Sequence, residues 1–558
     1  MTHSPIPRSG GAILADALIA NGADTVFCVP GESYLPFLDA AADRRESLRV
    51  VTCRHEGGAA YMAEAFGKLT GRPGVCFVTR GPGACHAAVG VHTAFQDSTP
   101  MVLLVGQVER PFRTREAFQE VEYRQMFGPL AKWVAEVDDP ARLPEYVARA
   151  YAAAVGGRPG PVVLAVPEDM LADVATVPDV GPRPLTLPHP GEDDLARLRL
   201  LLSAARRPLA IVGGGGWDAQ AADEVRRFLE VNALPVAASF RCQDIIDNDS
   251  AVYVGELGTS VSPQLARRVR EADLLLVLGA RLGEMSTQGY SLVEAPEPRQ
   301  ALIHVYPGAE EIGRVYRPAL GIVAAMPAIA KGLLRLEPLG EVPWRAWCEE
   351  ARSDYENGQI PGACPGDLDM GEVMRVVRER LPPDAIVCNG AGNYTGWVQR
   401  FYRYRRFRTQ LGPTNGSMGY GLPAALAAKS VYPERTVVAF AGDGCFLMTG
   451  QELATAVQHD LDPVILVVNN NMYGTIRMHQ EKMYPGRAMA TDLVNPDFAA
   501  LARSFGAHAE VVERTAEFEP AFDRALGAGK VALLELRIDP DAISTRTTLS
   551  AIRGQSSK

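Results

Sequence analysis

The chain has 558 residues, of which 47% are apolar and 22% are charged. This is an ordinary balance for a soluble globular protein, and the length predicts about three domains. The formal net charge of −10 argues against a nucleic-acid partner, because phosphate backbones are bound by clustered Lys and Arg. No apolar run is long enough to span a membrane. The start of the chain lacks a hydrophobic signal core, so we expect a cytoplasmic protein.

Cysteines and basic residues give no sign of a metal cluster or an RNA site. The nine cysteines include no C-x-x-C pair, and we expect them to be reduced and mostly buried. The one basic cluster, Arg400 to Arg408, alternates with aromatic residues. It is more typical of a solvated or interface edge than of RNA binding.

Residues 1–180 predict one α/β domain. Helices are expected over Gly11–Asn21 and Leu35–Ala42. Short apolar runs predict buried strands at Thr25–Val29, Arg49–Cys53, Val75–Thr79, Met101–Val105 and Val162–Val166. Strands that alternate with helices predict a parallel sheet wrapped by helices.

A proline-rich stretch, Pro178 to Pro190, predicts a linker to a second α/β domain at 191–340. Strands are expected there at Leu209–Val212 and Leu274–Leu278. The first runs into Gly213–Gly216, which predicts either a phosphate-binding loop or a tight structural turn.

Residues 337–369 hold three prolines and predict a connection to a third α/β unit at 366–540. The polar residues 541–558 predict a mobile tail or a lid. The fold class expected for the whole chain is therefore three doubly wound parallel-sheet α/β domains.

The third unit contains the most informative stretch, from Val437 to Gln480. Two apolar runs, Val437–Ala441 and Pro463–Val468, predict neighbouring buried strands with a helix between them over Gln451–His459. The first strand ends at Gly442-Asp443-Gly444 and the second at Asn469-Asn470. The spacing is about one strand-helix-strand unit, which puts Asp443 and Asn470 on the same edge of the sheet.

This edge has the chemistry of a diphosphate and metal site. Carboxylate and amide oxygens suit Mg²⁺ that keeps phosphate oxygens as its other ligands. The amides of Gly444 and Cys445 stand at a helix start, where they can hold a diphosphate. No His lies near Cys445 in the sequence to activate it as a nucleophile.

These residues resemble the thiamine diphosphate signature of the decarboxylase and carboligase superfamily, which includes acetolactate synthase. The resemblance covers nearly the whole chain. It implies a pyrimidine-binding, a middle and a diphosphate-binding domain. It also implies that Asp443, Asn470 and the main-chain carbonyl of Met472 coordinate the metal.

Glu56 follows the strand Arg49–Cys53 and would alone be read as a surface or capping carboxylate. The segment from Arg54 to Val75 looks like the acetolactate-synthase version of the activating segment. The resemblance implies that Glu56 bonds the pyrimidine ring of the coenzyme and starts its activation.

Further cofactor-binding positions are implied by the same resemblance. Met418 resembles the hydrophobic wedge beneath the bent coenzyme, although a Met among glycines also suits a packed core. Asn393 looks like a side-chain donor of a second diphosphate loop. The remaining expected positions are small or lie in the signature itself: Gly392, Gly416, Gly442, Gly444, Cys445 and Gly474.

Three positions concern the substrate. Gln119 matches the synthase and could donate a hydrogen bond to a developing alkoxide; the alternative is a Gln on a helix surface. Glu32 departs from the Pro-Gly-Gly of the synthase and is either a proton donor or guide for a polar substrate, or a structural carboxylate. His479 replaces a Trp of the synthase and makes the acceptor pocket more polar.

The resemblance implies a carboligase or decarboxylase of 2-keto acids that forms an enamine and condenses it with an aldehyde or a keto acid. The alternative is a carbon–carbon lyase on 2-hydroxy ketones or 2-hydroxyacyl-CoA. A homodimer or homotetramer with active sites at its interfaces is implied. Arg281–Met285 replaces the Arg-Phe-Asp-Asp-Arg segment of the synthase, so FAD stays an unsupported alternative.

Overall fold

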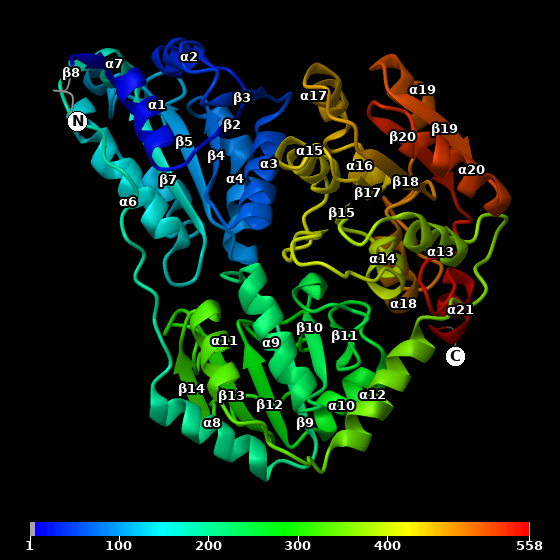
Figure 1. Cartoon of the computed structure of the whole chain (residues 1–558). Coiled ribbons are helices and arrows are strands. Elements are labelled where there is room, and N and C mark those ends of the chain that lie inside the picture. The colour runs from blue at the N-terminus through cyan, green and yellow to red at the C-terminus, as the bar shows by residue number, and fades with distance from the viewer. Residues whose placement is uncertain (1–5, 557–558) are drawn as a thin grey trace. The chain divides into compact units, whose positions relative to one another are not determined.

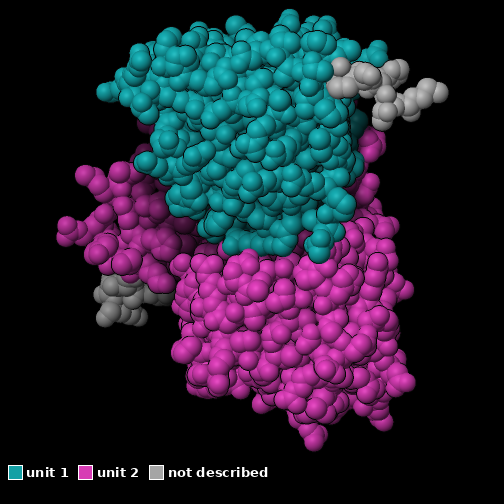
Figure 2. All heavy atoms as spheres, turned by 90° about the vertical axis from the view of Figure 1, so that its left-hand side faces the viewer, with its two compact units in different colours: residues 1–186, 426–433, 449–461 teal, residues 187–425, 434–448, 462–558 magenta. Residues whose placement is uncertain are grey.

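The structure is a computed structural model that describes residues 6–556. Its contacts divide the chain into two compact units, which Figure 2 distinguishes by colour. The first unit holds residues up to Thr186 together with 426–433 and 449–461, and the second holds the remainder. Residues 1–5 of the first predicted domain and 557–558 of the predicted tail lie outside the described residues.

The first unit is built on a six-stranded parallel sheet with the order β3-β2-β4-β5-β7-β6. Its strands are β2 (Thr25–Cys28), β3 (Arg49–Thr52), β4 (Gly74–Val78), β5 (Met101–Gln107), β6 (Trp133–Glu136) and β7 (Pro161–Pro167). Its helices are α1 (Gly10–Ala20), α2 (Leu35–Ala42), α3 (Glu56–Thr70), α4 (Pro82–Asp97), α5 (Tyr123–Phe127), α6 (Leu143–Val155) and α7 (Glu168–Ala172). Two short strands, β1 (Arg8–Ser9) and β8 (Val174–Ala175), pair antiparallel beside them.

The second unit contains two further six-stranded parallel sheets. The first has the order β11-β10-β9-β12-β13-β14. Its strands are β9 (Pro208–Val212), β10 (Val236–Ser239), β11 (Tyr253–Leu257), β12 (Leu274–Leu278), β13 (Ala301–Tyr306) and β14 (Leu320–Val323). Its helices are α8 (Glu192–Ala204), α9 (Ala219–Val231), α10 (Pro263–Glu271), α11 (Met326–Arg335) and α12 (Arg345–Gly358).

The other sheet of this unit has the order β16-β15-β17-β18-β20-β19. Its strands are β15 (Ile386–Asn389), β16 (Gln410–Leu411), β17 (Val437–Gly442), β18 (Val464–Asn469), β19 (His508–Val512) and β20 (Ala532–Arg537). The helices of this region are α13 (Met370–Arg380), α14 (Thr395–Phe401), α16 (Asp443–Phe446), α18 (Gly474–Met483), α19 (Phe498–Ser504), α20 (Thr515–Leu526) and α21 (Leu549–Ser556). The same stretch of the chain contains α17 (Leu453–Gln458), which belongs to the first unit, and α15 (Gly421–Val431), which belongs to the first unit from residue 426 on.

Strands that are covered on both faces explain why the strands of the sequence read as continuous apolar runs. In β12, Leu274, Leu276 and Leu278 belong to one buried cluster, whereas Leu275 and Val277 belong to another. Side chains alternate across a sheet, so the two clusters lie on opposite faces. Figure 1 shows helices on both sides of this sheet.

The predicted fold class is confirmed, because all three six-stranded sheets are parallel and their strands alternate with helices. The strands predicted in the first unit correspond to β2, β3, β4, β5 and β7. Several other strands were not predicted separately, such as β11, which contains the buried Glu256 and a glycine with a φ of 116° at Gly255. The predicted domain limits of 1–180, 191–340 and 366–540 stay predictions.

Two segments that were not expected to contain helices do contain them: the connection at 337–369 and the expected tail or lid at 541–558. The segment 337–369 contains the helix α12, which buries Cys348 and Ala351. The segment expected to be a mobile tail or lid ends in helix α21, which packs beside α18 (Figure 1). The helix buries Leu549 against Met472 and Ile543, and Arg553 adds an ion pair with Glu481. Few apolar residues stand in this polar stretch, so its pattern gave little sign of a helix. The movement expected of a tail or lid stays a prediction.

The basic stretch at Arg400–Arg408 lies between the two sheets of the second unit. Arg403 and Arg405 form ion pairs with Asp249, and Arg403 also pairs with Glu356. These arginines therefore join parts of one protein unit. Within residues 6–556, no helix is both long and apolar enough to cross a membrane.

Arg553 fixes α21 to α18 through Glu481. The Glu481 carboxylate accepts hydrogen bonds of 2.9 and 2.6 Å from Nε and Nη2 of Arg553. The hydrogen bond from Arg553 lowers the pKa of Glu481 to about 2. A lowered folded-state pKa gives stability that is present above the unfolded-state pKa and is lost as the pH falls toward the folded-state value.

We therefore expect Arg553→Gln to lower the free energy of unfolding at pH 7 by about 1 kcal/mol, since Arg553 is half exposed and solvent screens its charge. The loss should be smaller at a pH of about 3, within the window between the two pKa values. Chemical denaturation at both pH values measures the difference. Arg299→Gln, which removes an exposed pair with Glu294, is the control, and equal losses in the two variants would contradict the assignment.

Candidate active site

The register of β17 and β18 brings the signature residues to one edge of the sheet. Gly442 of β17 pairs with Val468 of β18, so both strands end at the same level. Asp443 begins α16 directly after β17, and Asn470 follows β18. Parallel strands carry their ligand sites at this carboxyl edge.

Asp443 is buried and well supplied with donors. Its Oδ1 accepts a hydrogen bond of 2.9 Å from the amide of Gly444, and its Oδ2 accepts one of 2.8 Å from Nδ2 of Asn495. Burial raises the pKa of Asp443. A carboxylate buried in this way gains from a positive partner, which a divalent cation would supply.

Asn495 is a residue that the sequence reasoning missed. Besides Asp443, its Nδ2 lies 3.0 Å from Oδ1 of Asn469 and 3.2 Å from Oδ1 of Asn471. Its own Oδ1 is buried and has no hydrogen-bond partner among residues 6–556. Asn495 precedes a proline, which marks a turn but not its contact with Asp443.

A cavity of about 260 Å³ opens beside this edge. It is lined by every residue expected on the diphosphate side of the coenzyme: Gly392, Asn393, Gly416, Met418, Gly442, Asp443, Gly444, Cys445, Asn470, Met472 and Gly474. Their roles as ligands stay predictions, but the structure does bring them together. His479 is exposed on α18 and does not line this cavity.

The glycines of this cavity allow close packing. A Cβ at Gly444 would lie 2.5 Å from the Tyr473 ring, and one at Gly442 would lie 3.1 Å from Tyr394. Gly416 has a φ of 70° and no atom within 4 Å of an added Cβ. Cys445 is buried, and its Sγ lies 3.4 Å from the Tyr394 hydroxyl. It is therefore part of the wall of the cavity.

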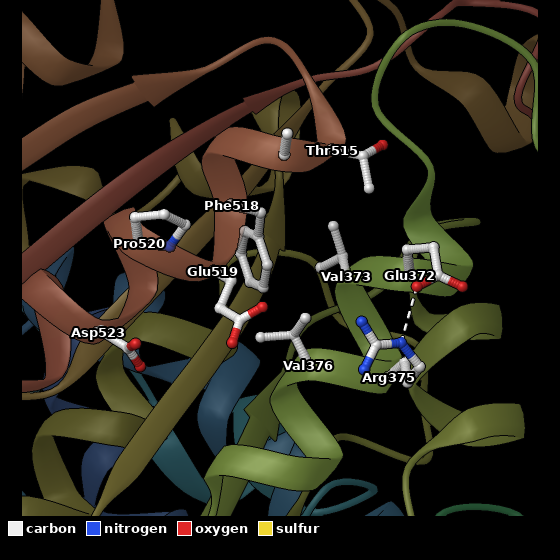
Figure 3. A pocket seen from close by; sticks show the side chains of 10 residues that line it. Glu372, Val373, Arg375, Val376, Thr515, Phe518, Glu519, Pro520 and Asp523 are labelled. Atoms are coloured by element: carbon white, nitrogen blue, oxygen red, sulfur yellow. Dashed lines mark hydrogen bonds and ion pairs between the residues drawn. The ribbon is translucent and has the colours of Figure 1, made fainter.

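A larger cavity of about 440 Å³ lies between α13 and α20. Figure 3 shows its lining of apolar and charged side chains, including Val376, Phe518 and Glu519, with Arg375 bonded to Glu372. None of the signature residues lines it. Size alone therefore does not identify the site.

In the first unit, Glu56 is the first residue of α3, directly after the turn that ends β3. Its side chain is 13% exposed, and Oε2 lies 2.8 Å from Nδ1 of His86. The rings of His55 and His86 stack with centroids 4.5 Å apart. The sequence did not reveal His86, because it lies 30 residues further along, in α4.

Glu452 anchors the turn that carries Glu56. This carboxylate has no exposed surface and belongs to the segment 449–461 of the first unit. It accepts hydrogen bonds from the amides of Arg54 and His55 and from the Thr455 hydroxyl. A Cβ at Gly58 would lie 2.5 Å from its Oε1, which explains why a glycine stands there.

The other two residues expected in the first unit lie near the same sheet edge. Gln119 has a φ of 65° and lies in a turn, so the alternative of a Gln on a helix surface is wrong. Its carbonyl would be 2.7 Å from a Cβ at Gly81, while Glu56 Oε1 would be 3.5 Å from a Cβ at Gly83. Glu32 begins a 3-10 turn after β2 and pairs with Arg80.

The four-glycine loop of the middle sheet is tightly packed. A Cβ at Gly213 would lie 1.8 Å from Oγ of Ser239, and one at Gly214 would lie 2.0 Å from the carbonyl of Gly279. Trp217 donates a hydrogen bond of 2.9 Å from Nε1 to the carbonyl of Gly213. These contacts favour the interpretation as a structural turn.

Fold and site together define a thiamine diphosphate-dependent enzyme, and comparison with known proteins agrees. The chain matches the N-terminal TPP binding domain of thiamine pyrophosphate enzymes at 8–126, their central domain at 195–333 and their C-terminal TPP binding domain at 390–536. The chain belongs to this family.

Curated relatives narrow the type within the family. The acetolactate synthase large subunit of Parasynechococcus marenigrum is 36% identical over 90% of this chain and 83% of its own length. The acetolactate synthase isozyme 2 large subunit of Escherichia coli is 32% identical over 95% of this chain and 96% of its own length. The acetolactate synthase large subunit of Corynebacterium glutamicum is 31% identical over 94% of this chain and 85% of its own length. The chain is thus an acetolactate synthase-like, thiamine diphosphate-dependent enzyme.

We expect Glu452→Gln to loosen the turn that presents Glu56. An amide has only one acceptor oxygen. At the place of Oε1 it still accepts from the amides of Arg54 and His55, but the Thr455 hydroxyl then loses the acceptor that Oε2 supplies, at a cost of about 1–3 kcal/mol. Urea unfolding and coenzyme-dependent turnover should both decline. The exposed Glu46→Gln is the control, and unchanged stability in Glu452→Gln would show that the turn does not depend on this carboxylate.

Proposed function

We propose that this enzyme transfers the carbons left after decarboxylation of a 2-keto acid to an aldehyde or a second keto acid. The observation that carries the proposal is one cavity that collects the whole set of diphosphate-side residues around Asp443. The names of the relatives support the same reaction type. Thiamine diphosphate, when bound, supplies the electron sink for the loss of CO₂.

We infer that Asp443, Asn470 and the carbonyl of Met472 would hold Mg²⁺, which would help to bind the diphosphate. The donor set fits the ion, since one carboxylate and two neutral oxygens are hard ligands that leave room for phosphate oxygens. The buried Oδ1 of Asn495, which lacks a partner among the described residues, adds an acceptor for a water of the ion. Asn495 then orients Asp443 from the outer side.

Glu56 is the group that holds the proton shared with the coenzyme ring. His86 binds one of its carboxylate oxygens, which leaves the other for the ring. Gln119, Glu32 and His479 are the proposed substrate-side residues; the position of Gln119 in a turn near Gly81 supports its place near the reacting carbons. The exposed His479 has less support.

We also propose that a second copy of the chain is the partner. The proposed domain limits are those given above, 1–180, 191–340 and 366–540.

A panel of 2-keto acids and aldehydes on coenzyme-loaded protein tests the function. Release of CO₂ with formation of a hydroxy ketone or hydroxy keto acid is expected. Aldehyde release from 2-hydroxy ketones without CO₂ would support the lyase instead.

We expect Glu56→Gln to lower turnover in the same panel by roughly 10²–10⁴-fold, because a positioned proton-transfer group contributes about that much. The melting temperature and the circular dichroism spectrum should match those of the parent, which shows that the fold is kept. Turnover within threefold of the parent would reject this role for Glu56.

Asn495→Ala should raise the Mg²⁺ concentration needed for coenzyme binding by about 10–100-fold, since residues that orient metal ligands affect affinity by this amount. Melting curves at fixed thiamine diphosphate and increasing Mg²⁺ measure it. Asn357→Ala removes an exposed amide of the same unit and is the matched control. Superimposable Mg²⁺ titrations for the two variants would refute the role of Asn495.

A further inference from the structure

Arg80 has a buried charge to which the proposed function assigns no role. It follows β4 at the carboxyl edge of the first sheet and is only 8% exposed. Its Nη1 lies 2.7 Å from Oε2 of Glu168, and its Nη2 lies 2.6 Å from Oε1 of Glu32. Its Nε is buried and has no hydrogen-bond partner among residues 6–556.

The unpaired Nε indicates that the contact with Glu32 is incomplete. Nε and Nη2 form the side edge of a guanidinium, which matches the two oxygens of a carboxylate. Glu32 uses one oxygen on Nη2 and leaves Nε without an acceptor. A buried donor left unsatisfied lowers stability, so a carboxylate that bonds both nitrogens would be favoured over Glu32.

Glu32 can be displaced. Its side chain is 65% exposed, compared with 35% for Glu168. An exposed carboxylate loses little when it exchanges a protein partner for water. Glu168 would keep Nη1, and the guanidinium would still face two negative charges after the exchange.

The place of Arg80 fits a ligand that reaches the reacting atoms. The loop from Thr79 to Gly83 passes Glu32 on one side, since a Cβ at Gly31 would lie 2.5 Å from that of Thr79. The same loop passes Gln119 at Gly81 and Glu56 at Gly83. The exposed ring of Phe118 lies 6.0 Å from Cζ of Arg80.

We propose that Arg80 binds a second carboxylate on the substrate, so that the enzyme prefers 2-keto acids with an additional carboxylate, and that Glu32 occupies this position in the free enzyme. The inference rests on the proposed function for the identity of the reacting group. In this proposal Glu32 competes with the substrate carboxylate for Arg80 and is displaced when the substrate binds. A purely structural ion triad would instead require Glu32 to stay in place.

Binding of an unreactive ligand pair tests the site without turnover. Isothermal titration of the coenzyme-loaded protein with succinate and butyrate compares ligands of equal length that differ in one carboxylate. We expect the parent to bind succinate at least about tenfold more tightly, Arg80→Lys to lose most of that preference, and Glu32→Gln to bind succinate more tightly than the parent. The opposite signs of the two variants are the decisive feature.

Arg110→Lys is the control, because Arg110 also bridges two carboxylates, Asp169 and Asp173, in the same unit. It should leave both affinities unchanged. Equal binding of succinate and butyrate to the parent, or weaker succinate binding in Glu32→Gln, would overturn the proposal. Because Glu32 is exposed, that variant informs even where Arg80→Lys lowers the melting temperature.

Kinetics separate this inference from the function itself. With 2-keto acids that carry or lack a second carboxylate, Arg80→Lys should raise KM for the first class by at least about tenfold and leave kcat for the second class within about threefold. Failure of every 2-keto acid to react would reject the proposed function, whereas the succinate titration would still decide the role of Arg80.

Discussion

A parallel sheet sends every strand in one direction, so the loops that follow its strands gather at a single edge. Both candidate regions of this protein depend on this constraint. In the first sheet it gathers Glu32, Arg80 and Glu56, which follow three different strands. In the sheet of β17 and β18 it gathers Asp443 and Asn470. Residues far apart in the chain thus become neighbours because of the sheet's direction.

The cost of this arrangement is that charged groups are buried where the loops crowd together. Glu452 illustrates how the protein compensates for that cost: two backbone amides and a hydroxyl surround a carboxylate with no exposed surface. The bonds also fix the first turn of α3. The buried Glu452 thus holds the turn before α3, and this turn sets the position of Glu56.

Apolar periodicity and the signature allowed the fold class and the diphosphate-side residues to be predicted from the sequence. Strands such as β12 are apolar throughout, and Gly442-Asp443-Gly444 has a fixed spacing to Asn470, so both signals are local. Asn495, His86 and Glu452 were missed because each acts through a contact across many residues. Helix α21 was missed because few of its residues are apolar, and because its contacts with Ile543, Met472 and Glu481 join parts of the chain that no periodicity connects. The sequence shows which residue types stand at these positions, but not which distant residues they contact.

Two buried groups connect these observations to function. Within residues 6–556, Nε of Arg80 and Oδ1 of Asn495 both lack hydrogen-bond partners, and each such group costs about 1–3 kcal/mol. Both stand at carboxyl edges of parallel sheets, where ligands bind. One is a donor beside carboxylates and the other an acceptor beside a buried acid, so they call for ligands of opposite charge. An anionic substrate at Arg80 and a hydrated cation at Asp443 would supply the missing hydrogen-bond partners. The free energy that these unpaired groups cost the free protein would then strengthen the binding of substrate and cation.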